Sequence, residues 1–227
     1  METVLVTGAA RGIGLALARH FSAAGLSVIA THRGEPSDEL AALADADGVR
    51  LHALDVTNEQ AVTELGEALA GETLDILVNN AGVIGPGREA NDPLTAERWL
   101  ETFRINTLSP LWVSQSVLGS LTRSANPRVI TVSSQMGSLE HGGTGLIAYR
   151  SSKAAVNKVM HVLSQEWREH NITVCPIHPG WVRTDMGGDA ADISPDDSAA
   201  GIVKLALSLT LEQSGTFYTW DGRVHPW

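Results

Sequence analysis

Two side chains that could pass a proton lie four residues apart in the second half of the chain. Tyr149 and Lys153 share one face if residues 147–169 form a helix, as the three-and-four spacing of apolar side chains from Ala154 to Trp167 indicates. A free tyrosine has a pKa near ~10, so a phenol that exchanges protons near neutrality needs a shift of roughly 3 units. An ammonium about 4 Å away supplies such a shift at an effective dielectric constant of roughly 20. The pair predicts a general acid, although such spacing also arises by chance on the order of one time in ten.

A glycine-rich turn near the start of the chain predicts a phosphate-binding site. Residues 3–6 are β-formers, Thr7-Gly8-Ala9-Ala10-Arg11-Gly12-Ile13-Gly14 follows, and an apolar helical pattern then runs to Phe21. Glycines at such a turn let the backbone approach a pyrophosphate, and the free amides at the helix start donate to it. An ordinary loop is the alternative, but the position between the first strand and the first helix favours a dinucleotide.

The end of the second predicted strand, residues 27–31, indicates which dinucleotide the site takes. An acidic side chain there accepts hydrogen bonds from a ribose 2′-hydroxyl, whereas a cation suits a 2′-phosphate. Arg33 stands at this end and Arg11 lies in the glycine turn. We therefore expect NADP(H) to be preferred, with NAD(H) possible. Glu35 is the counter-argument, but the neighbouring Gly34 and Pro36 suggest that it belongs to a loop that turns away.

Polar residues also follow the third and fourth predicted strands, residues 49–54 and 74–78. Ligands of open parallel sheets gather at the carboxyl ends of the strands. The candidate cofactor contacts at these two ends are Asp55, Val56, Asn80, Ala81 and Gly82. Two plainer interpretations remain open, because Asp55 could cap a helix beginning near Asn58 and residues 79–82 could form a simple turn.

Strand-like and helix-like patterns alternate along the whole chain, without repeats, linkers or low-complexity segments. They predict an α/β fold with a doubly wound parallel sheet of about seven strands, helices on both faces, and one domain spanning residues 1–227. The strands are expected at residues 3–6, 27–31, 49–54, 74–78, 128–132, 172–177 and 216–220, and the helices at 15–21, 38–46, 57–70, 93–121, 147–169 and 196–209. Pro110 should bend the longest helix and let Asn106, one turn earlier, hold a water or a carbonyl.

The composition limits the classes of partner. With a formal net charge of −10 over 227 residues and no basic stripe, the chain offers little to nucleic acid or anionic lipid. It begins without a leader pattern and has no apolar run approaching the ~18 residues of a membrane span, so we expect a cytoplasmic protein with no membrane partner. The single cysteine, Cys175, should be a small buried hydrophobe, and the eight histidines lack metal-ligand spacing, so no metal is expected.

Taken together, the motifs fall in the order, and nearly at the spacing, of one enzyme family. They are Thr7-Gly8-x-x-x-Gly12-Ile13-Gly14, Asn79-Asn80-Ala81-Gly82, Asn106, Ser133-Ser134, Tyr149-x-x-x-Lys153 and the run from Pro179-Gly180 to Thr184. Over its whole length the chain resembles the short-chain dehydrogenase/reductase family. The resemblance implies a Rossmann-like fold and hydride transfer between a nicotinamide cofactor and a carbonyl or alcohol, with the Tyr149–Lys153 pair at the catalytic centre.

The resemblance also implies a role for each catalytic residue. Tyr149 is the general acid in reduction, and Ser134 hydrogen-bonds the substrate carbonyl and steadies the developing oxyanion. Lys153 lowers the phenol pKa and holds the nicotinamide ribose, while Asn106 anchors a water in the proton path. The residues expected to contact the cofactor are Gly8, Arg11, Gly12, Ile13, Gly14, Arg33, Asp55, Val56, Asn80, Ala81, Gly82, Tyr149, Lys153, Pro179, Gly180, Val182 and Thr184.

The choice between two adjacent serines rests on a short pattern. Ser134 begins the S-x-x-G sequence that ends at Gly137, so it is preferred, and Ser133 stays an alternative. Ser134 precedes Tyr149 by 15 residues, two more than is usual in the family, so the intervening loop must bulge.

Within the family, residues 148–153, 178–188 and 222–227 resemble the subgroup that contains the sniffer-type carbonyl reductases and the C-factor signal proteins. Residues 187–195 leave little chain to close over a large substrate, and their small, acidic composition is typical of a mobile lid. The resemblance implies an NADPH-dependent reductase of small aldehydes and ketones. The alternative is a signalling or regulatory protein that binds a dinucleotide without relevant turnover. Pairing through the helices at 93–121 and 147–169 implies a homodimer or homotetramer.

Overall fold

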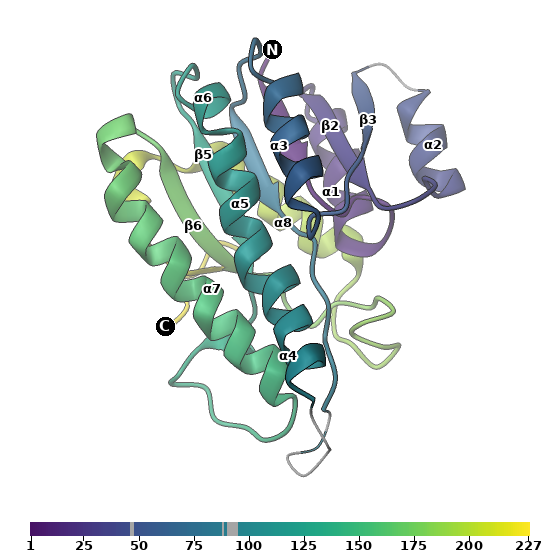
Figure 1. Cartoon of the computed structure of the whole chain (residues 1–227), viewed down its shortest axis with the longest axis vertical. Helices are drawn as coiled ribbons and strands as arrows, with labels where there is room; N and C mark the ends of the chain where they lie inside the picture. The colour runs from purple at the N-terminus through teal and green to yellow at the C-terminus, as the bar shows by residue number, and fades with distance from the viewer. Residues whose placement is uncertain (46–47, 88, 90–94) are drawn as a thin grey trace.

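The computed structural model describes residues 1–45, 48–87, 89 and 95–227. In these residues, seven parallel strands form one sheet in the order β3-β2-β1-β4-β5-β6-β7 (Figure 1). The strands are β1 (Thr3–Val6), β2 (Ser27–His32), β3 (Val49–Ala53), β4 (Ile76–Asn79), β5 (Arg128–Val132), β6 (Thr173–His178) and β7 (Tyr218–Thr219). The order reverses between β1 and β4, where a doubly wound sheet opens a crevice at the carboxyl ends of its strands.

Helices cover both faces of this sheet (Figure 1). One face carries α1 (Gly12–Ala23), α2 (Asp38–Ala44) and α8 (Pro195–Ser208), and the other carries α3 (Glu59–Ala68), α5 (Ser109–Ser116) and α7 (Ile147–Glu166). Alternate residues of each strand join opposite cores, so that Val4 and Val6 pack in the α1 layer and Leu5 in the α3 layer. Burial on both faces explains why the strands read as unbroken apolar runs. The predicted fold class is confirmed.

Two strands begin two residues later than predicted, for local reasons. β4 begins at Ile76 rather than at residue 74, and the carboxylate of Asp75 just before it accepts a hydrogen bond from the backbone N–H of Thr3 at 2.8 Å. β7 has two residues rather than the five of 216–220. The chain turns back after it through Gly222, at φ +86°, so that Val224 pairs with Tyr218 in the antiparallel direction.

The long helix predicted over residues 93–121 is divided, and residues 93–94 lie outside the described residues. Its parts are α4 (Ala96–Phe103), the π-helical turn η1 (Arg104–Leu108), α5 and the short α6 (Leu118–Leu121). Pro110 lies in the first turn of α5. Because proline has no amide, it cannot donate to the carbonyl of Asn106 four residues earlier. The predicted distortion is therefore present, as a wide turn ahead of the proline rather than a bend at it.

Three shorter 3-10 turns complete the described elements, η2 (Gln135–Gly137), η3 (Trp167–His170) and η4 (Leu211–Gln213). Cys175 is fully buried in β6, and burial raises the pKa of its thiol to about 12, which confirms it as a small buried hydrophobe. No helix among the described residues is long and apolar enough to cross a membrane. The same residues contain no group of three or more His, Cys, Asp or Glu side chains that could hold a metal ion.

Candidate active site

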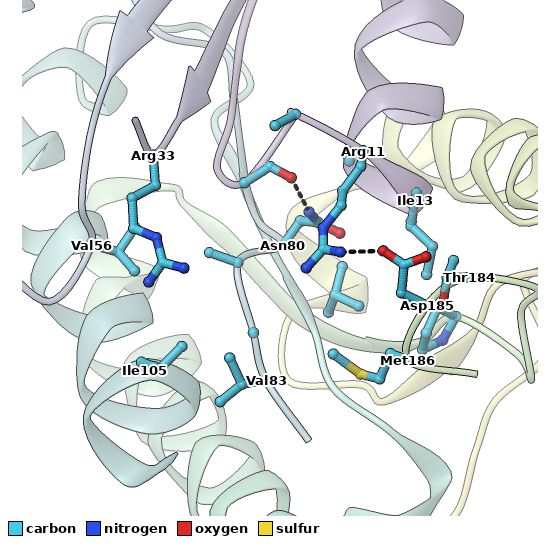
Figure 2. A pocket seen from close by; sticks show the side chains of 18 of the residues that line it. Arg11, Ile13, Arg33, Val56, Asn80, Val83, Ile105, Thr184, Asp185 and Met186 are labelled. Atoms are coloured by element: carbon cyan, nitrogen blue, oxygen red, sulfur yellow. Dashed lines mark hydrogen bonds and ion pairs between the residues drawn. The ribbon is translucent and has the colours of Figure 1, made fainter. Parts of the chain in front are cut away.

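A cleft of about 580 Å³ opens at the carboxyl ends of the strands (Figure 2). That volume lies in the range of small-molecule and cofactor sites. Its walls come from the segments that directly follow each of β1 to β6. The predicted cofactor residues that line it are Gly8, Arg11, Gly12, Ile13, Gly14, Arg33, Asp55, Val56, Asn80, Ala81, Gly82, Tyr149, Lys153, Pro179 and Thr184. Residues from across the chain thus meet in one cavity.

The glycine turn has the shape of an anion cradle. Gly8 and Gly12 have φ values of +66° and +55°, which side chains rarely adopt, and a Cβ on Gly14 would overlap the carbonyl oxygen of Gly8. The amide of Asn80 holds the turn, with Nδ2 donating to the carbonyls of Thr7 (2.9 Å) and Gly8 (3.1 Å). No side chain caps the start of α1, and its first turn contains no acidic residue. The free amides and the glycine cradle fit the diphosphate of a dinucleotide.

The two arginines predicted to flank a 2′-phosphate lie apart (Figure 2). Arg11 forms an ion pair with Asp185, from the segment after β6, rather than accompanying Arg33. Arg33 lines the cleft at the end of β2 and makes no hydrogen bond or ion pair with any described residue. Glu35 is exposed and is not part of the cleft lining. The cation free to meet a phosphate at this end is therefore Arg33, and the expectation that Arg11 joins it does not hold in this structure.

Asp55 closes the same end of the cleft. Its Oδ1 accepts hydrogen bonds from the Thr57 backbone N–H at 2.9 Å and from the Thr57 hydroxyl at 2.7 Å. The hydrogen bond from the Thr57 hydroxyl is the largest cause that holds the pKa of Asp55 below its usual value, and the one from the backbone N–H is the next. The charge of Arg33 also lowers this pKa. The cap of α3 is Asn58, whose Oδ1 accepts from the backbone of Gln60 and Ala61. The helix-cap interpretation of Asp55 is therefore wrong.

Tyr149 and Lys153 lie on one face of α7, as their spacing predicted, but the predicted pKa shift is absent. Burial raises the pKa of Tyr149, and the interaction of its phenol with Ser134 opposes that rise only in part. The ammonium of Lys153 lies 5.8 Å from the centre of the Tyr149 ring and donates to the Val132 carbonyl at 2.8 Å. Burial lowers the pKa of Lys153 to about 8. Burial disfavours the charged form of each group because both lose water.

The adjacent serines face different neighbours. Ser133 is buried and donates to Oδ1 of Asn157 at 2.6 Å. The Ser134 hydroxyl accepts a hydrogen bond from the backbone N–H of Met136 at 3.1 Å. It also interacts with the Tyr149 phenol and lowers the pKa of that phenol. Ser133 is thus committed to a structural hydrogen bond, while Ser134 lies beside the proposed acid.

The loop that must bulge before Tyr149 is tied at both ends. Ser138 and Leu139 donate to the Trp227 carbonyl oxygen at 2.8 and 3.1 Å through the Ser138 hydroxyl and the Leu139 backbone N–H. At the other end, Leu146 adopts a left-handed φ of +52° immediately before α7. The start of the longer loop between Ser134 and Tyr149 is therefore held in place by hydrogen bonds to Trp227.

Asn106 clamps two cleft segments together. Its Oδ1 accepts from the Val83 backbone N–H at 2.9 Å, and its Nδ2 donates to the Val83 carbonyl at 2.8 Å and to the Ser152 hydroxyl at 2.9 Å. Both amide hydrogens are used. Any water that Asn106 holds must therefore be bound through its main-chain carbonyl, which Pro110 leaves without the usual helical donor.

Two predicted cofactor contacts do not line the cleft, and neither do the catalytic candidates Asn106 and Ser134. Gly180 packs on Ile193 and Trp220, and Val182 is buried and pairs with Ile193 in an isolated bridge. The lining residues that were not predicted as cofactor contacts are Ala10, Leu54, Thr57, Val83, Ile105, Val132, Ser133, Arg183, Asp185, Met186 and Pro195. Most of these residues are next to a motif residue in the sequence, and this adjacency is the feature from which they could have been predicted.

The predicted lid forms a hydrogen-bonded loop after β6. Arg183 and Ile193 are joined by a backbone hydrogen bond of 2.9 Å, and the indole N–H of Trp181 donates to the Gly187 carbonyl at 2.9 Å. Asp185 and Met186 lie at the edge that faces the glycine turn (Figure 2). The loop thus forms one wall of the cleft.

Comparison with known proteins agrees with this geometry. The model of the family described as short chain dehydrogenase matches residues 2–193. The C-signal protein of Myxococcus xanthus is 40% identical over 155 residues, which cover 68% of this chain and 93% of that protein. The carbonyl reductase Sniffer of D. melanogaster superposes with a TM-score of 0.95 at 29% identity over all of both chains. The NADPH-bound carbonyl reductase from chicken fatty liver has a TM-score of 0.91 and 34% identity over 100% of this chain and 94% of that one.

The parallel sheet and the glycine cradle define a fold of the Rossmann type with a turn suited to a dinucleotide. The chain belongs to the short-chain dehydrogenase family, as its motifs predicted. Its likeness to a Sniffer carbonyl reductase and to the C-signal protein also confirms the predicted subgroup.

Proposed function

We propose that this protein is an NADPH-dependent reductase of small aldehydes and ketones. The observation that supports it most is the meeting of Tyr149, Lys153 and Ser134 beside a cleft whose opposite wall is the glycine cradle. Tyr149 lines this cleft, which is large enough for a dinucleotide, and the Ser134 hydroxyl lies next to the Tyr149 phenol.

Each side chain has a defined task in this proposal. Tyr149 donates its phenolic proton to the carbonyl oxygen of the substrate, and the Ser134 hydroxyl donates a hydrogen bond to the same oxygen as it gains negative charge. The nicotinamide, when bound, supplies the hydride. Lys153 stabilises the phenolate that remains and holds the nicotinamide ribose. Asn106 fixes the wall beside Lys153, and its main-chain carbonyl holds a water that returns the proton.

The preference for NADPH is proposed from Arg33. Its guanidinium makes no hydrogen bond or ion pair with the described residues at the end of β2, and the carboxylate that lines the same end, Asp55, has its Oδ1 engaged by Thr57. The NADPH named with the chicken carbonyl reductase supports the same choice.

The direct test follows NADPH absorbance with the purified chain against a panel of small aldehydes, ketones and quinones. We expect oxidation of NADPH with several of them. A chain that binds NADPH tightly but oxidises it with no member of the panel would exclude a reductase of this substrate class.

The 40% identity to the protein named C-signal favours a second candidate, a signalling or regulatory role in which the dinucleotide is bound without relevant turnover. The two candidates separate in the absorbance assay. The intact Tyr149, Lys153 and Ser134 support the reductase.

We further propose that residues 1–227 act as one NAD(P)-binding domain in the cytoplasm and pair as a homodimer or homotetramer. The continuous core on each face of one sheet supports the single domain. Exposed apolar side chains on the outer surface of α7, Ile147 and Val162, support the pairing.

A further inference from the structure

A second pocket, of about 330 Å³, lies beside the candidate active site on the side of β7. Its polar and aromatic lining consists of Gln135, His178, Thr219, Trp220, Arg223 and His225. Gln135 directly follows Ser134, and His178 directly precedes Pro179, which lines the large cleft. A ligand group in this pocket would therefore belong to a molecule whose other end can reach Ser134 and Tyr149.

The composition of this lining is unusual for the molecule. The chain has a net charge of −10, yet the described lining includes an arginine and two histidines and no carboxylate. Arg223 donates through Nε to Asp221 at 2.8 Å, and its two terminal nitrogens have no hydrogen-bond partner among the described residues. The terminal nitrogens of a guanidinium form the fork that binds a carboxylate with two parallel hydrogen bonds.

His178 lines the same pocket and has one buried polar atom without a partner. The side chain is 9% exposed, and its Nδ1 is buried without a hydrogen-bond partner among the described residues. Leaving such an atom unpaired is costly, so buried polar groups without partners usually mark a ligand, a water or an ion. The His225 ring lies 5.7 Å away and donates from Nδ1 to the Pro226 carbonyl at 2.7 Å, which leaves its Nε2 for the pocket.

We propose that this pocket is a subsite for a carboxylate of the substrate, so that the preferred substrates are carbonyl compounds carrying an acid group on the side away from the cofactor. The inference rests on the proposed reductase function. The free fork of Arg223 binds the carboxylate, and His178 donates to it after taking up a proton. Trp220 and the stem of Arg223 cover the carbon chain between the two groups.

Protonation couples this subsite to pH. Burial, followed by the charges of His225 and His141, lowers the pKa of His178 to about 4, while Asp221 acts in the opposite direction. Arg223, which shares the lining, also disfavours a second positive charge. A bound carboxylate favours the imidazolium and so raises the pKa of His178. Binding then takes up a proton, and the affinity for the acid should increase as the pH falls from 8 towards 5.

A titration without turnover tests the pocket itself. Pentanoate is added to the protein between pH 4.5 and 8 while the imidazole proton resonances are recorded, with the His178 signal assigned from His178→Gln. We expect pentanoate to raise the apparent pKa of His178 by about one unit and methyl pentanoate to leave it unchanged. Equal effects of acid and ester, or no change at His178, would overturn the subsite.

Arginine variants identify the anchor. Arg223→Gln should weaken pentanoate binding by about tenfold, as expected for a lost charge-assisted pair. Arg50→Gln is the matched control, because Arg50 also pairs with one surface acid, Glu72, but lies at β3. Equal losses in both variants, or none in Arg223→Gln, would contradict the assignment.

Turnover separates this inference from the function on which it rests. Straight-chain oxo acids of increasing length are compared with their methyl esters, with NADPH, and the ratio of kcat/KM for acid over ester is measured. We expect a ratio of about ten or more at one chain length, lost in Arg223→Gln. If neutral ketones are reduced without any preference for acids, the subsite is wrong and the reductase stands. If no carbonyl compound is reduced, the proposed function fails, and the pentanoate titration still decides the pocket.

Discussion

At the scale of single residues, the proposed chemistry depends on one phenol whose surroundings favour the protonated form. Burial raises the pKa of Tyr149, and Ser134 counteracts this only in part. In the chain without a cofactor, Tyr149 therefore keeps its proton, and it is a proton donor rather than an activated base. The balance shifts only when a positive charge comes closer to the phenol, which is the task proposed for Lys153.

The first prediction concerns that proton. Tyr149→Phe should reduce turnover by roughly 10²-fold or more, because it removes a positioned acid, while NADPH affinity stays close to that of the wild type. Steady-state rates and cofactor fluorescence titration measure the two quantities. Turnover within about tenfold of the wild type would show that another group supplies the proton.

The second prediction concerns Lys153 and stability. Its pKa of about 8 lies below the ordinary value of 10.5, so between these values the unfolded chain binds more protons and the free energy of unfolding rises with pH. Lys153→Met lacks this contribution. The free energy of unfolding of the variant minus that of the wild type should therefore fall by about 2 to 4 kcal/mol between pH 8 and 10.5, measured by urea unfolding. A difference that stays constant across this window would mean that the ammonium is not desolvated.

The third prediction concerns Arg33. Wild type should bind NADPH at least about tenfold more tightly than NADH, since charge-assisted hydrogen bonds contribute about 1.5 to 3 kcal/mol each, and Arg33→Ala should lose most of this preference. Arg11→Ala is the comparison, and its effect should be smaller because Asp185 already holds that guanidinium. Dissociation constants for both cofactors decide the matter. A preference unchanged in Arg33→Ala would mean that another residue reads the phosphate.

The sequence indicated which residues belong to the site better than it indicated which side chains they contact. Tyr149, Lys153 and Arg33, which all line the cleft, could be selected because their chemistry follows from residue type and local position. The partner of Arg11 was not found, because Asp185 lies 174 residues further along the chain. The direction of the Tyr149 pKa shift was also wrong, because it depends on burial that spacing along a helix does not reveal.

At the scale of elements, the loop after β6 and the glycine turn meet face to face. A Cβ on Gly12 would lie 3.2 Å from the Thr184 side chain, and the Arg11–Asp185 ion pair joins the same two segments. Both charged side chains are more than three-quarters exposed, so the pair contributes little to stability. The ion pair matters instead for binding, because it occupies the Arg11 guanidinium that could otherwise contact a phosphate of the cofactor.

The fourth prediction follows from this contact. Asp185→Asn should tighten NADPH binding by about two- to fivefold, because it frees Arg11 and removes a negative charge beside the phosphates. The unfolding midpoint should barely change. Repeating the titration in Arg11→Ala and in the double variant completes a cycle. If Asp185→Asn tightens binding equally in the absence of Arg11, the ion pair is not the cause.

The elements themselves were predictable to different degrees. Strands buried on both faces stand out as apolar runs, so all seven were placed within two residues at either end. β7 is shorter than predicted because its chain reversal depends on Gly222 and on pairing with residues further along. A distortion of the helix over 93–121 was predicted from Pro110, but its division and the π-helical form of η1 were not.

At the scale of the whole molecule, the exposed side of α7 is the surface that bears most directly on assembly. Val162 is 38% exposed and lies on the side of the helix away from the core residues Met160 and Leu163. Burying such side chains against a symmetry mate stabilises a dimer. No described contact of the single chain covers this surface.

The fifth prediction is therefore a twofold-symmetric dimer, or a tetramer, at micromolar concentration, measured by light scattering. Val162→Glu should shift the mass towards the monomer, whereas Lys158→Glu, at an exposed position on the same helix, should act less. A wild type that shows only the monomer mass would refute the assembly.

The reversal of strand order between β1 and β4 also determines when the cofactor site can exist. Thr7 and Asn80 are 73 residues apart, yet Asn80 holds the glycine turn in shape. While the chain is being synthesised, the turn emerges long before its support, and a loop of that length must close before the two segments meet. Dinucleotide binding should therefore appear late in refolding, after most helical signal has returned. The bound cofactor would then report the last long-range step of folding rather than the first.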